Sequence, residues 1–364
     1  MRINKFKPNS VFSSRKIQSQ DFSRYVGGRT RHSFANGKSA IIAALKLWGI
    51  YKENILIPYY ICKDVEEAVV CSGNNVVYCD IDISDLNISY DSIVEICTKC
   101  DIKVVLVPSL YGNPARIDDI ERFCRKRHIY LLNDCAQSIG SFVNEKHIAS
   151  YGDAAITSLS PGKPLPGFSG GYLSINADIK DYYTSTHHLY YICACSTYLF
   201  SRLWIDSIIS RIIGRIISFV CYKFITYDLI DISKFRLPIW VHNYNMKFFY
   251  YLYNGKFEYR SIFISQFQKS TYYRVISSSR GFGVPYVLVM VFNTSNLASE
   301  FKEYILEKKI YYSSGYSINT LCFDSSKYLV DKLINLPIDL DFRKRDYLFK
   351  SIADWTPKKN NKET

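Results

Sequence analysis

The stretch from residue 104 to 134 reads VVLVPSLYGNPARIDDIERFCRKRHIYLLND. It opens on an apolar run at 104–108 and closes on a second run at 130–133, and both are short enough to be strands. Between them, residues 117–126 place apolar side chains at helical spacing, with charged side chains on the other face. Because a helix joining two buried strands forms a parallel unit, this stretch predicts a parallel sheet with helices packed on it.

The same alternation continues along the chain. It predicts further helices at 38–48, 64–71 and 90–98, further strands at 55–57 and 76–80, and a strand-like run at 153–158. The fold class expected from this pattern is α/β, with a mixed, mostly parallel sheet.

Changes in composition divide the chain into three parts. Residues 1–24 are expected to form an N-terminal arm, and residues 25–235 a large domain that includes a helical segment at 196–232. After residue 236 the sequence becomes rich in aromatic residues, with a strand expected at 286–291 and a helix at 298–308. This texture predicts a smaller C-terminal α+β domain at 236–364, with a frayed tail at 357–364.

The charge of the chain does not by itself select a partner. A formal charge of +13 would suit nucleic acid, an anionic membrane surface or a phosphorylated substrate. The basic residues are dispersed, however, and the densest group, at 122–128, falls on a predicted amphipathic helix, where it is typical of a solvated face. A nucleic-acid partner is therefore not expected.

The cysteines indicate a reducing compartment. All 11 are spaced irregularly, and the N-terminal 20 residues lack the apolar run of a secretory signal, so we expect free thiols in a cytoplasmic protein. Cys97 and Cys100 have the spacing of half a zinc site, but no second pair completes it, which favours core cysteines. No metal site is expected.

One apolar segment raises the question of membrane contact. Residues 198–232 are rich in isoleucine at helical spacing but are interrupted by charged residues, which excludes an uninterrupted transmembrane span. A helix that faces the core or a dimer partner is the favoured interpretation, and a helix lying on a membrane surface is the alternative.

Two residues at the ends of neighbouring strand-like runs suggest a cofactor site. Asp134 ends the run at 130–133, and Lys163 lies in the Gly/Pro-rich loop after the run at 153–158. Pyridoxal phosphate requires a carboxylate that keeps its pyridine nitrogen protonated and a lysine that holds its aldehyde as a Schiff base. Its phosphate binds well at a helix N-terminus, and Asn36–Ser39 opens a predicted helix, with Ser158 as a further hydroxyl donor.

These residues belong to a set of motifs that resembles the DegT/DnrJ/EryC1/StrS sugar aminotransferases, which have the type I, aspartate-aminotransferase-like fold. The resemblance runs from about residue 34 to 176 and returns weakly at 336–338. Its carriers, in the family's order, are Gly37–Ile41, Ile57–Cys62, Asp80–Asp82, Leu110–Pro114, Asn133–Gln137, Gly152–Asp153, Ser158–Lys163 and Gly170–Gly171.

The resemblance implies a role for each matched residue. Lys163 would be the catalytic residue that holds pyridoxal 5'-phosphate, Asp134 would pair with the pyridine nitrogen, and Gln137 would contact the ring hydroxyl. Lys38, mainly through its backbone, Ser39 and Ser158 would bind the phosphate. The full set of candidate cofactor-binding residues is Asp134, Gln137, Ser158, Ser160, Gly37, Lys38, Ser39 and Tyr60.

Three positions depart from the family's pattern. Cys62 stands where an aromatic ring commonly stacks on the cofactor, so that role falls to Tyr60 or Tyr59 or is lost. Ser160 replaces a frequent histidine, and Ser169 replaces the usual glutamate before the paired glycines. Lys163 itself argues against the dehydratase branch of the family, which has histidine at this position.

The activity implied by the resemblance is transfer of an amino group from glutamate or glutamine to a keto-sugar, expected to be nucleotide-linked. The pathway would be cell-surface polysaccharide or secondary-metabolite biosynthesis, and the enzyme would be a homodimer. Two alternatives stay open. One is a pyridoxal-phosphate enzyme with a different reaction outcome, and the other is a degenerate relative with a regulatory or scaffold role.

Overall fold

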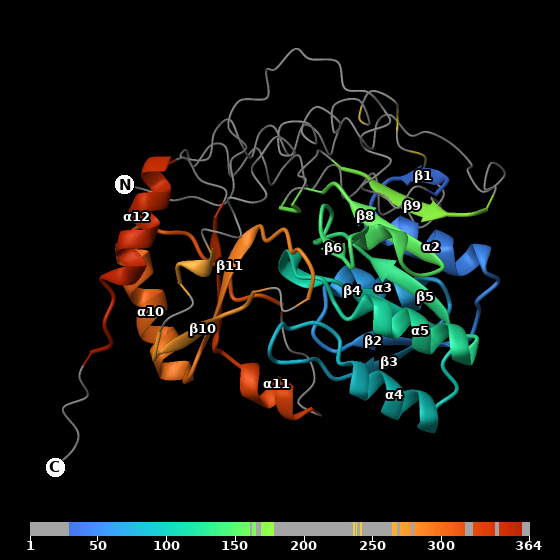
Figure 1. The fold of residues 1–364 in the computed structure, drawn as a ribbon, viewed down its shortest axis with the longest axis horizontal. Helices are drawn as coiled ribbons and strands as arrows, with labels where there is room; N and C mark the ends of the chain where they lie inside the picture. Colours follow the sequence, from blue (N-terminus) through green and yellow to red (C-terminus); the bar gives the residue numbers. More distant parts are fainter. Residues whose placement is uncertain are drawn as a thin grey trace.

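The structure, a computed structural model, describes residues 29–160, 162–164, 169–177, 236, 238, 241, 264–267, 270–277, 280–316, 323–338 and 342–358. Within these ranges the chain forms a seven-stranded sheet, a three-stranded sheet and a small two-stranded sheet, with helices around the two larger ones (Figure 1). The helical segment expected at 196–232 and the arm expected at 1–24 lie outside the described residues. At the expected boundary at 235/236, only residue 236 is described. The division into domains therefore stays a prediction.

The larger sheet has seven strands in the order β1-β9-β8-β5-β4-β2-β3. Strands β2, β3, β4, β5 and β8 run parallel, whereas β9 is antiparallel to β8 and β1 is antiparallel to β9. The prediction of a mixed, mostly parallel α/β sheet is confirmed. The bounds are β1 (Arg31–Phe34), β2 (Asn54–Pro58), β3 (Asn75–Cys79), β4 (Val104–Pro108), β5 (Tyr130–Asp134), β8 (Ala154–Ser158) and β9 (Gly171–Ile175).

Helices cover both faces of this sheet because its strands are apolar on both sides. Ile55 and Ile57 of β2 pack into a core with α2 and α3, whereas Leu56 between them packs into a second core with α4 and α5. The helices are α2 (Gly37–Leu47), α3 (Lys63–Cys71), α4 (Tyr90–Lys99) and α5 (Ile117–Arg127), each close to its predicted range. Short elements complete this part: η1 (Leu110–Gly112), β6 (Phe142–Val143), β7 (Lys146–His147) and η2 (Ile148–Ser150).

The C-terminal part contains a three-stranded antiparallel sheet in the order β10-β11-β12. Phe292, Phe301 and Trp355 belong to the core between this sheet and its helices, whereas Val289 and Val291 pack on tyrosines of the N-terminal part. The elements are β10 (Tyr273–Val275), β11 (Val287–Phe292), α10 (Ser295–Glu307), α11 (Asp324–Leu329), β12 (Leu333–Pro337) and α12 (Phe342–Ala353). The strand and the helix expected at 286–291 and 298–308 correspond to β11 and α10.

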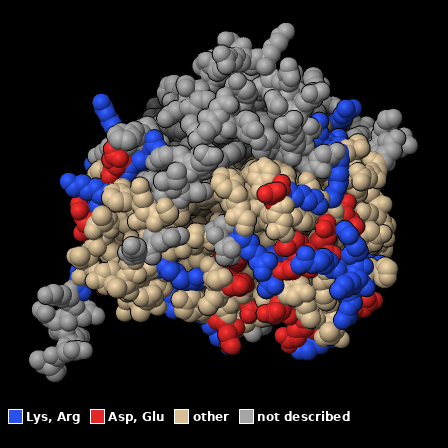
Figure 2. All heavy atoms as spheres, in the orientation of Figure 1, with Lys and Arg blue, Asp and Glu red and all other residues tan. Residues whose placement is uncertain are grey.

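Side chains of both signs are interspersed on the surface around α5 (Figure 2). Arg122 contacts Asp118 and Asp119 one turn earlier, and Arg125 lies 3.7 Å from Glu121. Since acidic side chains of the same helix neutralise the basic ones, this group has the character of a solvated helix face.

One cysteine pair differs from the sequence-based interpretation. Cys97 is half-buried and Cys100 is exposed, so the assignment of Cys100 to the core is wrong. Cys100 follows the last turn of α4, where the chain leaves the amphipathic helix toward solvent. Within the described ranges, no helix combines the length and the apolar character that crossing a bilayer requires.

Candidate active site

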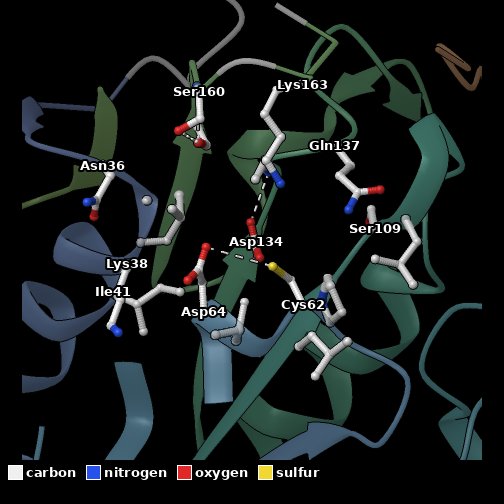
Figure 3. Close-up of a pocket in the computed structure, with 18 of the residues that line it drawn as sticks. Asn36, Lys38, Ile41, Cys62, Asp64, Ser109, Asp134, Gln137, Ser160 and Lys163 are labelled. Atoms are coloured by element: carbon white, nitrogen blue, oxygen red, sulfur yellow. Dashed lines mark hydrogen bonds between the residues drawn. The ribbon is translucent and has the colours of Figure 1, made fainter. Parts of the chain in front are cut away.

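A pocket of about 360 Å³ opens at the carboxyl ends of β4, β5 and β8. Residues at the N-terminus of α2 and at the start of α3 line it (Figure 3). Tyr316 from the C-terminal part lines it as well. Ligands of open α/β sheets gather at this edge, because the loops and helix N-termini that follow the strands converge there. A pocket of this size can enclose a small organic cofactor.

Lys163 extends from the loop after β8 into the pocket, toward Asp134 (Figure 3). Its backbone N–H donates to the carbonyl oxygen of Ser160 at 3.2 Å, so a tight turn sets the direction of the side chain. The side chain is half-buried, which leaves the amine accessible from the pocket.

Asp134 forms the floor of the pocket at the end of β5 and is 7% exposed. Burial raises the pKa of this carboxyl, while the charge of Lys163 and the Ala136 N–H oppose that rise. The Ala136 N–H donates to Oδ1 at 2.9 Å and does not use Oδ2, which can accept from a further donor. A protonated ring nitrogen is such a donor, and it would satisfy the carboxylate in a place that water reaches poorly.

The N-terminus of α2 is a candidate anion site. Asn36 caps the helix through Oδ1, which accepts the Ser39 N–H at 2.8 Å, and Gly37 and Lys38 contribute to the pocket wall. Helix N-terminal N–H groups attract phosphate because they lack partners within the helix. Ser158 and Ser160 add two hydroxyls that lie 3.2 Å apart on the same wall.

Glycine is required where β9 crosses the start of α2. A Cβ on Gly171 would lie 2.4 Å from the carbonyl oxygen of Asn36 and 2.7 Å from the Gly37 nitrogen. The strand and the helix N-terminus approach each other so closely that no side chain fits between them. Gly171 of the sequence motif therefore shapes the candidate anion site through packing.

Most of the predicted cofactor-binding residues line this one pocket: Gly37, Lys38, Asp134, Gln137, Ser158, Ser160 and Lys163. Two others do not. Ser39 is buried behind the helix N-terminus, and Tyr60 is 1% exposed within a tyrosine cluster, where its hydroxyl lies 2.5 Å from that of Tyr111. Tyr60 is therefore not available to stack on a group in the pocket.

Cys62 and Ser169, two of the positions that depart from the family's pattern, also lie at the pocket. Cys62 lines the pocket, and burial raises the pKa of its thiol, so this position presents a small neutral group in place of a ring. Ser169 donates through Oγ to the carbonyl oxygen of Ala35 at 2.7 Å and so joins the loop before β9 to the chain before α2. Lys38 directs its amine away, to Glu67 at 2.5 Å, and only its main chain serves the anion site.

Sequence reasoning missed Tyr316, which reaches the pocket from a segment far along the chain. Its hydroxyl accepts a hydrogen bond from Nε2 of Gln137. The sequence held no signal for this contact, because it depends on how the C-terminal sheet packs on the N-terminal one.

Comparison with known proteins relates the N-terminal half of the chain to one family. Residues 15–188 match the model of the DegT/DnrJ/EryC1/StrS aminotransferase family. GDP-perosamine synthase of Vibrio cholerae is 25% identical over 160 residues, which is 44% of this chain and 43% of that protein. UDP-2-acetamido-2-deoxy-3-oxo-D-glucuronate aminotransferase of Pseudomonas aeruginosa is 30% identical over 156 residues, 42% of this chain and 43% of that protein. The matched region thus spans less than half the length of these relatives.

Solved structures extend the likeness to most of the chain. A DegT DnrJ EryC1 StrS aminotransferase from Brucella abortus superimposes with a TM-score of 0.68 at 16% identity, over 92% of this chain and 88% of that one. DesV of S. venezuelae gives a TM-score of 0.70 at 15% identity, over 92% and 87% of the two chains. At this identity the likeness shows the fold, and the chain has the fold of these aminotransferases.

Proposed function

We propose that this chain, a member of the DegT/DnrJ/EryC1/StrS aminotransferase family over residues 15–188, is a pyridoxal-phosphate-dependent aminotransferase. It would transfer an amino group from glutamate or glutamine to a nucleotide-linked keto-sugar, as a cytoplasmic homodimer. The observation that carries the proposal is that Lys163 and Asp134 enter one pocket from neighbouring strand ends, beside a helix N-terminus.

The residues of the pocket fit pyridoxal phosphate. The cofactor carries an anion at one end, a basic ring nitrogen at another and an aldehyde between them. The pocket offers α2 N–H groups and serine hydroxyls, the buried carboxylate of Asp134, and the amine of Lys163, each from a different element. The close approach at Gly171 holds the start of α2 against β9.

Pyridoxal phosphate, when bound, supplies an aldehyde that takes up amino groups and a ring that accepts electrons. Asp134 would hold a proton on the ring nitrogen through its Oδ2, which the Ala136 N–H does not occupy. Nζ of Lys163 would hold the cofactor covalently, and as a free amine it would carry the proton that amino transfer moves. The N–H groups of α2 would fix the phosphate end.

The proposed substrate class is supported by the names of the relatives and by the net charge of the chain. The names of both relatives above refer to nucleotide-linked sugars, and the second one is called a 3-oxo-sugar aminotransferase. A net charge of +13 suits a substrate that carries a pyrophosphate, because a positive field raises its local concentration.

An absorbance spectrum of the purified protein with pyridoxal phosphate tests the proposal. We expect a visible band that borohydride abolishes and that excess glutamate converts to the band of the aminated cofactor. Lys163→Ala should lose the borohydride-sensitive band and at least about 1,000-fold in turnover, because no other group replaces a covalent amine. Lys103→Ala, at an exposed position before β4, is the matched control and should behave as the unmodified protein.

A regulatory or scaffold role is the second candidate, and Cys62 is the observation that favours it. This position lines the pocket but provides no ring to stack on a cofactor. Under this alternative the protein would show no band with pyridoxal phosphate at any concentration that saturates an ordinary aminotransferase. A band without a glutamate response would instead indicate a pyridoxal-phosphate enzyme of different outcome.

A further inference from the structure

Gln137 forms an unusually complete set of hydrogen bonds for a side chain in a pocket wall. Its Oε1 accepts the backbone N–H of Tyr111 at 2.9 Å and the hydroxyl of Tyr286 at 2.8 Å. Its Nε2 donates to the hydroxyl of Tyr316. Three separate segments of the chain therefore hold one amide group.

These contacts fix which way the amide points. A backbone N–H can only donate, so the atom that faces Tyr111 must be the oxygen. The two lone pairs of Oε1 are used by Tyr111 and Tyr286, and one hydrogen of Nε2 is used by Tyr316. Among the described residues no partner takes the second hydrogen of Nε2, and Gln137 lines the pocket. Toward a ligand, Gln137 is a donor and not an acceptor.

We propose that Tyr286 and Tyr316 are positioning residues, which hold the Gln137 amide so that its remaining N–H points to an anionic oxygen of bound pyridoxal phosphate. The inference rests on the proposed function and deepens it. Neither tyrosine needs to contact the cofactor for this role. Both act through Gln137, on the oxygen of the ring that the family resemblance assigns to this glutamine.

Burial keeps the hydroxyl groups of Tyr286 and Tyr316 protonated, as these hydrogen bonds require. Burial raises the pKa of Tyr286 and of Tyr316 well above the ordinary value, so both stay protonated through the working range of pH. Tyr286 can therefore donate to Oε1 throughout. The Tyr316 hydroxyl oxygen accepts the hydrogen bond from Nε2 of Gln137, and the hydroxyl retains its own hydrogen.

The residues just before Tyr316 pack closely against the tyrosines of the N-terminal part. Gly315 has a φ of 78°, and a Cβ there would lie 2.4 Å from the hydroxyl of Tyr60. That hydroxyl accepts the Tyr316 N–H at 3.4 Å and lies 2.5 Å from the hydroxyl of Tyr111. The position of the C-terminal segment thus sets the orientation of a side chain on the N-terminal sheet.

The test is a pH titration of the visible absorption band of the pyridoxal-phosphate-loaded protein. A donated N–H stabilises the anionic form of the ring oxygen, so its loss raises the pH at which the band changes. Tyr286→Phe and Tyr316→Phe should each raise that apparent pKa by about half a unit or more. Each should also weaken binding of pyridoxal phosphate by about 3- to 10-fold, as expected for one buried hydrogen bond.

Tyr151→Phe is the matched control. This tyrosine is 5% exposed, and its hydroxyl donates to the carbonyl oxygen of Val143 at 2.8 Å, the same distance as in the Tyr286 contact. It precedes β8, at the end of the strand opposite to the pocket. The control should lose stability like the other two variants but titrate as the unmodified protein.

Gln137→Glu gives an independent measurement, because a carboxylate has no N–H to donate. It should shift the titration in the same direction and further, and adding Tyr286→Phe to it should cause little additional shift, since both act through one group. Full additivity would overturn the inference, and so would tyrosine variants that titrate like the unmodified protein. Failure of the unmodified protein to form any band would overturn the proposed function, and the inference with it.

Discussion

Asp134 is a charged side chain in a position where burial favours an uncharged one. Its pKa is raised by burial, and the opposing contributions of Lys163 and the Ala136 N–H do not cancel that rise. The folded protein without a ligand therefore holds the Asp134 proton more tightly than the unfolded chain does. An acid of this kind costs stability as the pH rises above its ordinary range, and a bound ring nitrogen that shares its proton would relieve the cost.

Asp134→Asn should accordingly stabilise the protein in the absence of pyridoxal phosphate and abolish its activity. At pH 7 we expect an increase of about 1 kcal/mol in the free energy of unfolding, because the amide has no charge to desolvate. The gain should vanish below about pH 4, where the unfolded carboxyl is itself protonated. Urea unfolding between pH 4 and 8 measures both points.

Asp346→Asn on α12, where the carboxylate is exposed, serves as the control and should change little at any pH. A variant Asp134→Asn that is less stable than the original at neutral pH would show that Lys163 compensates the buried charge in full.

The sequence identified pocket residues that lie at strand ends. It did not identify, or misplaced, residues whose position depends on how distant segments pack. Asp134 and Lys163 could be found because strands of one parallel sheet end at the same edge. Tyr60 could not be placed, because Tyr59 and Tyr60 after β2 both turn into the interior, and Ile61 and Cys62 line the pocket instead. Tyr316 had no local pattern at all.

At the scale of elements, the contact between β9 and α2 decides the shape of the anion site. The antiparallel strand β9 pairs with β1 on one side and β8 on the other, which brings Gly171 opposite both Phe34 and Ser158. The chain then turns from β1 into α2 directly over Gly171. The N-terminal end of α2, the candidate phosphate site, is therefore held by a strand rather than by a loop.

Gly171→Ala should displace the first turn of α2. The added methyl group would meet main-chain atoms of Asn36 and Gly37, which cannot move without moving the helix N-terminus. We expect binding of pyridoxal phosphate to weaken by more than about 10-fold and the protein to lose about 1–3 kcal/mol of stability. Equilibrium dialysis with the cofactor and thermal unfolding measure these effects.

Gly49→Ala, just beyond the other end of α2, is the comparison variant. No atom lies within 4 Å of a Cβ there, and its φ of 70° makes the substitution costly for the backbone alone. It should destabilise the protein without weakening cofactor binding. Equal loss of binding in both variants would mean that general instability, and not the displaced helix start, is responsible.

The helices and strands of the N-terminal part agree with the sequence because their signals are local. Residues 117–126 carry an apolar stripe that matches α5, and the uninterrupted apolar run at 104–108 matches β4 residue for residue. Beyond residue 236 only β11 and α10 were anticipated. β12 and α11 are held by pairing and packing with distant segments, which no periodicity within them reveals.

At the scale of the whole molecule, a small polar network joins the two sheets. Ser325 on α11 donates through Oγ to Oδ1 of Asp80 after β3, and the hydroxyl of Tyr59 after β2 lies 2.8 Å from the same Oγ. Tyr59 also stacks on Phe323 at a centroid distance of 5.3 Å. These contacts adjoin the apolar tyrosine cluster, which includes Tyr59, Tyr60, Tyr111, Val289 and Val291. Together they fix the position of the C-terminal sheet on the N-terminal part.

Ser325→Ala should weaken the contact between the C-terminal sheet and the N-terminal part. It removes a donor from Asp80 and a partner from the buried Tyr59 hydroxyl, so we expect a loss of about 1–3 kcal/mol in the free energy of unfolding. Because the pocket depends on Tyr316 from the same side of the molecule, cofactor binding should weaken as well. Denaturant unfolding and limited proteolysis of the variant measure the effect.

Ser326→Ala distinguishes this contact from a local helix effect. Ser326 is the next residue of α11, but its hydroxyl donates to the carbonyl oxygen of Phe323 at 2.6 Å, within its own segment. It should cost about 1 kcal/mol or less and leave cofactor binding unchanged. If the two variants lose stability and binding equally, then the network does not couple the sheets, and the C-terminal sheet is held to the pocket by the apolar tyrosine cluster alone.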